Sequence, residues 1–253
     1  MSLLNRDGVN IYYEVHGSGP TILLTHGYSA DTSMWKPQIE ALSKNYRLVL
    51  WDMRGHGRSD YPEDPKQYSE TATLDDMAAI LDAVGAERAV IGGLSLGGYM
   101  SLAFHLKYPH RVRALLIIDT GPGYRKDAPR AGWNATAEEM AKKLESDGLD
   151  YLRQLSPERA TSHHRSADGL IKAARGMLTQ HDSRVIESLT SIKVPSIVIV
   201  GANDEPFLNS SDYMAAKIPG ARKAVIADAG HASNIDQPAK FNGEVLQFLA
   251  NLG

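Results

Sequence analysis

The sequence predicts an α/β fold in which a mostly parallel, twisted sheet carries helices on both faces. Short runs rich in β-branched and apolar residues alternate with stretches of helical periodicity along most of the chain. This alternation is typical of strand–helix–strand units. The stretch 121–190 does not follow it, and predicts a small helical insertion before the penultimate strand region.

Strands are expected where apolar runs end at turn residues. The first two runs, 9–15 and 21–25, are separated by residues 17–20, Gly-Ser-Gly-Pro. We expect these two runs to pair as an antiparallel edge of the sheet. Further strands are expected at 46–52, 89–94, 114–119, 196–200 and 223–227.

Helices are expected between these strands. Thr73 and Asp76 have the spacing of a capping box, which predicts a helix start before an apolar repeat that reaches Gly85. A second apolar repeat at 241–249 follows Pro238, and proline is favoured in the first turn of a helix.

The chain is interpreted as one core domain with an inserted cap. Residues 1–120 and 191–253 are expected to form the core, and residues 121–190 are expected to form a helical cap over the candidate active site described below. Pro122, Pro129 and Gly132 predict a broken start to this cap.

The first cap helix is expected near Thr136, which has capping-box spacing to Glu139. Most apolar cap residues are expected to pack on the core, but some must face the space that the cap encloses. Trp133, Met140 and Met177 are the candidates for lining this substrate pocket.

The segment 93–97, Gly-Leu-Ser-Leu-Gly, lies between the predicted strand at 89–94 and a helical stretch. In that context G-x-S-x-G predicts a nucleophile elbow, a sharp turn that exposes a serine at the start of a helix. The helix dipole and the free amide of Leu96 favour negative charge beside Ser95, where acyl transfer develops it. A phosphate-binding loop is excluded because Gly98 stands where that motif needs lysine.

A serine nucleophile needs a base, and the base needs a third group to orient it. His231 follows a late apolar run and is the candidate base. Asp204 follows the predicted strand at 196–200 and is the candidate acid. Asp119 also ends an apolar run, and is the alternative acid.

An oxyanion hole needs a second donor besides the Leu96 amide. The predicted strand at 21–25 runs into His26 and Gly27, where the chain can bend so that the Tyr28 amide points inward. Tyr28 and Leu96 are therefore the predicted oxyanion-hole residues. His26 is expected to hold the loop by hydrogen bonds.

Basic residues near the site have two possible roles. Arg54 and Arg58 are expected to belong to a buried turn tied to Asp52, with binding of an anionic substrate as the alternative. Arg125 and Arg130 open the cap, and could hold a substrate carboxylate or be exposed charge.

These pieces together resemble a serine hydrolase of the α/β-hydrolase superfamily. The order Ser95, Asp204, His231 along the chain is that of its triad. The length and the short insertion resemble small esterases and the 3-oxoadipate enol-lactonase type. Epoxide hydrolases and haloalkane dehalogenases share much of the pattern but use an aspartate nucleophile, so Ser95 argues against both. The matching segments are His26-Gly27, Trp35-x-Pro37-Gln38, 52–59, the elbow at Ser95, 201–204 and Gly230-His231.

The resemblance implies serine-dependent hydrolysis of small carboxylic esters or lactones through an acyl-enzyme intermediate, with no cofactor. Two alternative functions are compatible with the same triad. One is a C–C bond hydrolase or perhydrolase. The other is a small-molecule receptor that has retained the triad.

Composition limits the partners. A net charge of -3 over 253 residues gives no electrostatic footprint for nucleic acid or for an anionic membrane. The chain has no cysteine, and His163 and His164 lack the spacing of a metal motif, so we expect no metal site. No signal peptide or membrane-spanning stretch is evident, and a cytoplasmic location is expected. The sequence does not indicate an oligomeric state.

Overall fold

The structure, a computed structural model, describes residues 2–252, without the side chains of residues 154 and 157. Its strands are β1 Ser2–Arg6, β2 Val9–His16, β3 Thr21–Thr25, β4 Arg47–Trp51, β5 Ala89–Leu94, β6 Val112–Ile118, β7 Ser196–Gly201 and β8 Arg222–Ile226. They form one sheet in the order β1-β2-β4-β3-β5-β6-β7-β8. The neighbours from β4 to β8 are parallel, and β2 is antiparallel to both β1 and β4. The predicted α/β fold with a mostly parallel sheet is therefore confirmed.

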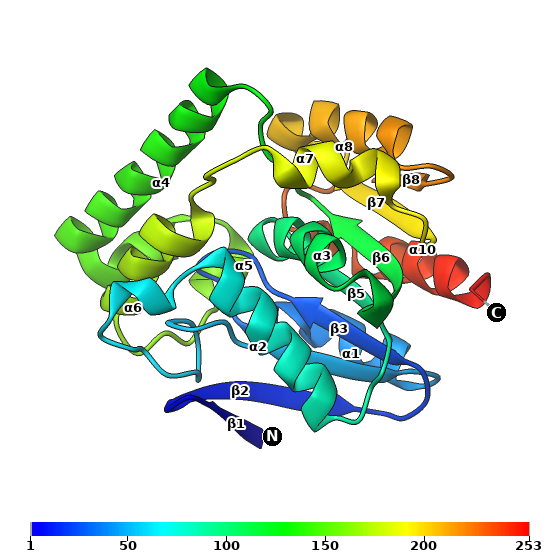
Figure 1. The fold of residues 1–253 in the computed structure, drawn as a ribbon, viewed down its shortest axis with the longest axis horizontal. Helices are drawn as coiled ribbons and strands as arrows, with labels where there is room; N and C mark the ends of the chain where they lie inside the picture. Colours follow the sequence, from blue (N-terminus) through cyan, green and yellow to red (C-terminus); the bar gives the residue numbers. More distant parts are fainter. Residues whose placement is uncertain (1, 253) are drawn as a thin grey trace.

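Helices cover both faces of the sheet (Figure 1). Those outside the insertion are η1 Thr32–Trp35, α1 Lys36–Ser43, η2 Pro65–Gln67, α2 Glu70–Ala83, α3 Leu96–Lys107, η3 Pro109–Arg111, α8 Glu205–Lys217, α9 Ser233–Asp236 and α10 Pro238–Ala250. On one face Met77, Phe104 and Met214 place α2, α3 and α8 in a single apolar cluster. On the other, Leu42 and Phe241 place α1 and α10 in a second cluster. The central strands are thus buried on both sides, as parallel sheets usually are.

The predicted pairing of the first two runs is wrong. β2 pairs with β1 and β4, whereas β3 lies between β4 and β5. The chain leaves β2 through Gly17 with φ of +72°, and a Cβ there would lie 2.2 Å from the carbonyl oxygen of Ser43. Residues 17–20 therefore form a crossover loop that passes close to the end of α1. Strand β1 is mostly exposed, so the apolar pattern does not reveal it.

Helix α2 begins earlier than the spacing of Thr73 and Asp76 predicts. Ser69 caps the helix, and its hydroxyl accepts a hydrogen bond from the Ala72 amide at 3.2 Å. The Thr73 hydroxyl instead donates to the Ser69 carbonyl at 2.9 Å. The capping-box spacing of Thr73 and Asp76 therefore lies one turn inside the helix. Asp76 does not cap the helix and pairs with Arg54.

The insertion follows β6 and precedes β7. It contains α4 Asp127–Asp147, η4 Gly148–Gln154, α5 Pro157–Ala160, α6 Ala167–Ala173, η5 Ala174–Leu178, α7 Arg184–Ser188 and η6 Leu189–Ser191. Helix α4 packs against α6 and η5. Figure 1 shows α4 and α6 on the left, outside the helical layers of the core.

The start of the insertion is irregular around Pro122 as expected, but Pro129 and Gly132 do not break it, because α4 begins at Asp127 and includes both. Proline is tolerated in the first turn of a helix, since the amides there have no intrahelical acceptor. Thr136 and Glu139 are consequently interior positions of α4 and do not cap it. Within residues 2–252, no helix is long and apolar enough to span a membrane.

Candidate active site

Ser95 lies in the turn between β5 and α3 with φ of +55° and ψ of -116°. A residue other than glycine rarely adopts positive φ, and such strain persists where the surrounding structure enforces it. Leu94 and Leu96 on either side are buried, whereas Ser95 is partly exposed. The turn therefore presents the serine outward at the start of a helix, which is the geometry of a nucleophile elbow.

Two glycines permit this turn. A Cβ at Gly97 would lie 2.2 Å from the Thr25 carbonyl oxygen, and one at Gly93 would lie 2.5 Å from the carbonyl carbon of Gly97. Backbone atoms cannot yield to a side chain at such distances without a shift of the strand or the helix. The glycines of the motif are thus explained by the close approach of α3 to β3 and β5.

His231 and Asp204 meet on the same side of the sheet. Asp204 follows β7 and its carboxylate is almost fully buried, while His231 follows β8 and is partly exposed. The Nδ1 atom of His231 lies 3.0 Å from the Oδ2 atom of Asp204. The ring of Phe207 stacks on His231, with centroids 4.9 Å apart and planes at 25°. These contacts hold the imidazole with its Nε2 edge directed away from the carboxylate.

Asp119, the alternative acid, has other partners. Its Oδ1 atom accepts a hydrogen bond from the Gly201 amide at 2.7 Å, and its Oδ2 atom accepts one from the Ser233 hydroxyl at 2.5 Å. Asp119 therefore ties the end of β6 to β7 and α9. Burial raises the pKa of its carboxyl to about 7. The structure pairs His231 with Asp204, whereas Asp119 forms hydrogen bonds that join elements of the core.

The turn after β3 lies against the elbow. A Cβ at Gly27 would lie 3.5 Å from the Cβ of Ser95, so the backbone that leads to Tyr28 passes beside the serine. The Nδ1 atom of His26 donates to the Gly27 carbonyl at 2.7 Å, and its Nε2 atom accepts from the Met53 amide at 3.0 Å. Burial lowers the pKa of His26 to about 4, so the ring is neutral at pH 7. The expected role of His26 in holding the loop is confirmed.

The turn that contains Arg54 is buried and is tied to Asp52 as expected, through the Arg58 amide, whereas the Arg54 side chain pairs with Asp76. The guanidinium of Arg54 donates two hydrogen bonds, of 2.6 and 2.8 Å, to the carboxylate of Asp76 in α2. Asp52 instead accepts hydrogen bonds from the amides of Thr32 and Arg58, at 2.7 and 2.9 Å. The sequence does not reveal the Asp76 partner because it lies on a different helix.

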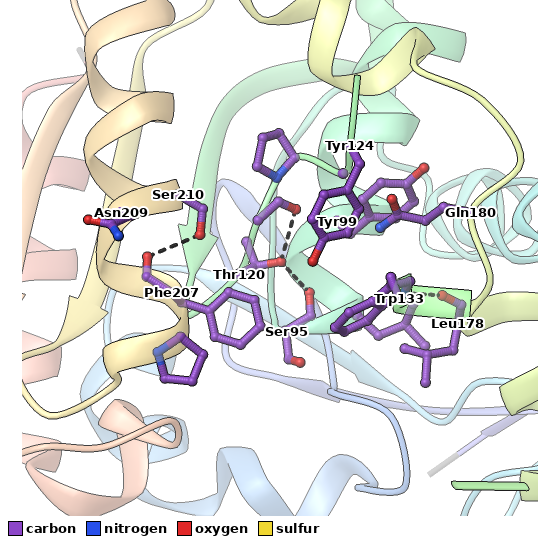
Figure 2. A pocket seen from close by; sticks show the side chains of 15 residues that line it. Ser95, Tyr99, Thr120, Tyr124, Trp133, Leu178, Gln180, Phe207, Asn209 and Ser210 are labelled. Carbon is purple, nitrogen blue, oxygen red and sulfur yellow. Dashed lines mark hydrogen bonds between the residues drawn. The ribbon is translucent and has the colours of Figure 1, made fainter. Parts of the chain in front are cut away.

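A cavity of about 240 Å³ opens at Ser95 (Figure 2). The elbow contributes Ser95 and Leu96 to its wall, and α3 contributes Tyr99. The loop 120–124 and the first turns of α8 form further parts of the wall. The insertion closes the cavity with Trp133, Leu178 and Gln180. Trp133 donates its indole N–H to the Leu178 carbonyl at 2.7 Å, which joins α4 to the end of η5.

The structure brings Trp133 to this cavity but not Met140 or Met177. Met140 faces a separate surface hollow along α4, and Met177 is 1% exposed within the apolar core. Tyr99, Phe207 and Gln180 line the cavity without a sequence signal that singles them out. Their placement depends on which faces of α3, α8 and the insertion point toward Ser95.

His164 joins the insertion to the core and does not lie on a solvated face. Its Nδ1 atom accepts from the Gly57 amide at 3.0 Å, and its Nε2 atom donates to the Ser29 carbonyl at 2.9 Å. The side chain of the neighbouring His163 is 65% exposed. Among the described residues, no group of three or more His, Cys, Asp or Glu side chains could hold a metal ion.

Comparison with known proteins agrees with this architecture. A family model described as the alpha/beta hydrolase fold matches residues 20–164. The chain is 30% identical to the 3-oxoadipate enol-lactonase 1 of Acinetobacter baylyi, over 94% of this chain and 92% of that protein. Two solved structures are each 28% identical. The enol-lactonase from Burkholderia xenovorans has a TM-score of 0.79 and covers 98% of this chain and 100% of its own. The thermophilic esterase from Thermogutta terrifontis has a TM-score of 0.81 and covers 99% and 97%. The chain therefore belongs to the α/β-hydrolase family.

Proposed function

We propose that this protein hydrolyses small carboxylic esters or lactones through an acyl-enzyme formed on Ser95. The observation that carries the proposal is that Ser95, which is partly exposed and has a strained backbone, lines a cavity of about 240 Å³. The His231–Asp204 pair and the turn at Gly27 supply the remaining groups that acyl transfer needs. The enol-lactonase and esterase names of the relatives support the same class of substrate.

In the acylation step, the Ser95 oxygen attacks the carbonyl carbon and its proton passes to Nε2 of His231. Asp204 holds the Nδ1–H of His231, so Nε2 is the nitrogen that accepts the proton. The electron pair of the carbonyl double bond moves onto the oxygen. The amides of Tyr28 and Leu96 donate hydrogen bonds to this oxyanion, and the Leu96 amide is available because it is the first of α3.

The tetrahedral intermediate then collapses, the bond to the alcohol oxygen breaks, and the alcohol takes the proton from His231. Water next attacks the acyl-enzyme and gives a proton to His231, which returns it to Ser95 as the acid leaves. In a lactone the alcohol stays attached to the acyl chain, so a single hydroxy acid is released. The proposal assigns no step to a cofactor or a metal.

Residues 121–190 act in this proposal as a cap domain. Trp133 and Leu178 form a wall opposite the elbow, and the cavity that they close suits a short acyl chain or a lactone ring. The cap thereby limits the size of the substrate.

The proposal is tested with the purified chain on p-nitrophenyl butanoate, a set of lactones and a ring-cleavage diketone, beside the Ser95→Ala variant. Turnover of the ester or a lactone that is lost in Ser95→Ala supports it. Turnover of the diketone alone would indicate a C–C bond hydrolase. Tight binding of these compounds with negligible turnover would indicate a receptor.

A further inference from the structure

We propose that the amide of Gln180 selects substrates whose bound portion is uncharged and carries a hydrogen-bonding atom, such as a ketone or hydroxyl oxygen. This inference rests on the proposed hydrolysis of esters or lactones and adds the chemical class of the group that enters the cavity. Gln180 acts here as a specificity residue and takes no part in the bond-making steps.

Gln180 is the buried polar side chain in the cavity wall that lacks a partner. It is only 8% exposed, and its Oε1 atom has no hydrogen-bond donor among the described residues. Figure 2 shows its side chain beside Tyr99 and Tyr124, across the cavity from Phe207 and Ser210. Buried polar groups are nearly always hydrogen-bonded, so an unpaired side-chain amide oxygen in a binding cavity calls for a partner on the ligand.

Three other hydrogen-bonding side chains of the cavity wall are already engaged. The Thr120 hydroxyl donates to the Ser95 carbonyl at 2.7 Å, and the Tyr99 hydroxyl donates to the Glu70 carboxylate at 3.1 Å. The Trp133 indole N–H is bonded within the insertion. These three groups donate within the protein. Tyr124 also lines the cavity but is only half-buried, so Gln180 is the nine-tenths-buried side chain that remains to contact a polar atom of the substrate.

The position of Gln180 is fixed by its backbone. The Asn134 side chain donates to the Gln180 carbonyl and accepts from the Gln180 amide, both at 2.8 Å. On the other side, Gly123 has φ of +88°, and a Cβ there would lie 2.8 Å from Gln180 Oε1. The loop 120–124 therefore approaches the amide closely. The backbone of Gln180 is thus fixed by Asn134 and its side chain lies against Gly123, so little backbone entropy is lost when a ligand binds.

The wall favours an uncharged ligand. No charged side chain is among the described residues that line the cavity. Behind Tyr99 the Glu70 carboxylate accepts from the Tyr99 hydroxyl and pairs with Arg184 at 3.4 Å, so this pair gives the wall no free cation. Arg130, a sequence candidate for binding a carboxylate, bonds to the Tyr124 carbonyl and to Asp127 instead. A substrate carboxylate in this cavity would lose its water without gaining a cationic partner, which is unfavourable.

The primary amide of glutamine suits both kinds of neutral partner. It carries two N–H donors and one acceptor oxygen, and rotation of the terminal amide exchanges their positions. A ketone can accept from the N–H group, and a hydroxyl can donate to the oxygen. The proposal therefore covers oxo- and hydroxy-substituted acyl groups.

Three methyl esters of similar size separate polarity from charge. Methyl pentanoate, methyl 4-oxopentanoate and monomethyl succinate release the same small alcohol, so the acyl part alone can fill the cavity. The oxo ester and the succinate ester differ by a methyl group in place of a carboxylate oxygen. We compare kcat/KM for methanol release by the wild type, Gln180→Leu, Gln180→Met and a control, Asn209→Leu, which removes an exposed amide at the cavity rim.

In the wild type, kcat/KM for the oxo ester should exceed that for methyl pentanoate by about three- to tenfold, which is the effect of one hydrogen bond. Gln180→Leu and Gln180→Met should abolish this ratio, whereas Asn209→Leu should preserve it. Monomethyl succinate should be the poorest substrate of the wild type. Hydrolysis of methyl pentanoate shows that a variant is folded. If Gln180→Leu does not fold, Gln180→Met provides the same test.

Three results would overturn the inference. The first is a wild-type preference for the oxo ester that persists in both Gln180 variants. The second is no preference for the oxo ester in the wild type. The third is monomethyl succinate as the best substrate, which would mean that the cavity binds anions. In each case hydrolysis of p-nitrophenyl butanoate would leave the proposed function standing. If the wild type hydrolyses none of these esters and no lactone, the proposed function fails and the inference fails with it.

Discussion

The Nδ1 atom of His231 lies 3.0 Å from Oδ2 of Asp204, and the carboxylate of Asp204 is almost fully buried. A buried carboxylate on Nδ1 fixes the tautomer and the orientation of the ring, and it stabilises the imidazolium that forms during acyl transfer. Asp119 reaches the Gly201 amide and the Ser233 hydroxyl instead. We therefore expect these two acids, which follow the neighbouring strands β7 and β6, to have separable effects on activity and on stability.

Replacement of the two acids should separate these effects. Asp204→Asn should lower kcat by about a thousand- to ten-thousandfold, because an amide no longer holds His231 in the required tautomer. Asp119→Asn should lower kcat far less, but should lower the free energy of unfolding by about 1–3 kcal/mol through a disturbed buried hydrogen bond. Ester hydrolysis and urea unfolding of both variants measure the two effects. A reversed ranking of kcat would identify Asp119 as the acid of the triad.

Much of this site could be predicted because each functional residue follows a strand. Ser95, Asp204 and His231 end apolar runs, and the carboxyl ends of parallel strands meet at one edge of a sheet. The lining of the cavity could not be predicted in the same way. Met140 and Met177 are as apolar as Trp133, and their periodicity does not reveal which face of the insertion turns toward the serine.

The order of the strands in the sheet could not be predicted from local sequence patterns either. The pattern locates β2 and β3, but it does not encode that β4 lies between them. Pairing is set by long-range packing, here by the close passage of Gly17 over the end of α1. Similarly, the pairing of Arg54 with Asp76 joins a loop to a helix and leaves no local signal.

Two glycines predict opposite effects of the same substitution. Gly97→Ala would place a Cβ 2.2 Å from the Thr25 carbonyl, so it should lower the melting temperature and abolish ester hydrolysis. Gly243 lies in α10, and a Cβ there would meet no neighbouring atom within 4 Å. Gly243→Ala should therefore stabilise the protein by about 0.5–1 kcal/mol with activity unchanged. Thermal unfolding and an ester assay test both. An active, stable Gly97→Ala variant would contradict the tight contact between α3 and β3.

The buried histidines predict how stability depends on pH. Burial lowers the pKa values of His26 and His164, that of His26 to about 4, whereas unfolded histidine titrates near 6.5. At these two sites the unfolded chain binds more protons than the folded one between these values, so their contribution to the free energy of unfolding should fall as the pH is lowered from about 6.5 to 4. Burial raises the pKa of Asp119 to about 7 and that of Asp52 to about 6, and these two carboxyls contribute with the opposite sign, so the histidine contribution is measured as the difference between the wild type and a histidine variant. Urea unfolding across this range measures the slope.

His164 and its exposed neighbour provide a matched pair for that experiment. His164→Asn keeps an acceptor for the Gly57 amide but removes the titrating ring, so it should reduce the slope. His163→Asn is the comparison variant: that side chain is 65% exposed and its Nδ1 atom lies 3.4 Å from Asp31 Oδ2, and the slope should decrease more in His164→Asn than in His163→Asn. Equal slopes in the wild type and both variants would show that His164 does not contribute to the acid sensitivity.

The size of the cavity predicts a profile with acyl chain length. Each methylene buried in the cavity adds about 0.8 kcal/mol of binding until the space is filled, after which a longer chain must clash or protrude. For p-nitrophenyl esters kcat/KM should therefore rise and then fall, with C2 to C6 acyl groups favoured over C12. A value that still rises at C12 would indicate an open groove and contradict the role proposed for the cap.

The central claim is that Ser95 is the nucleophile, and covalent labelling tests it most directly. A fluorophosphonate or sulfonyl fluoride should modify the folded protein at one residue, and peptide mass spectrometry should place the adduct on Ser95. The label and the ester hydrolysis should disappear together in Ser95→Ala, with kcat lower by about five to six orders of magnitude and the fold retained. An adduct on another serine, or a Ser95→Ala variant that keeps most of its activity, would contradict the account.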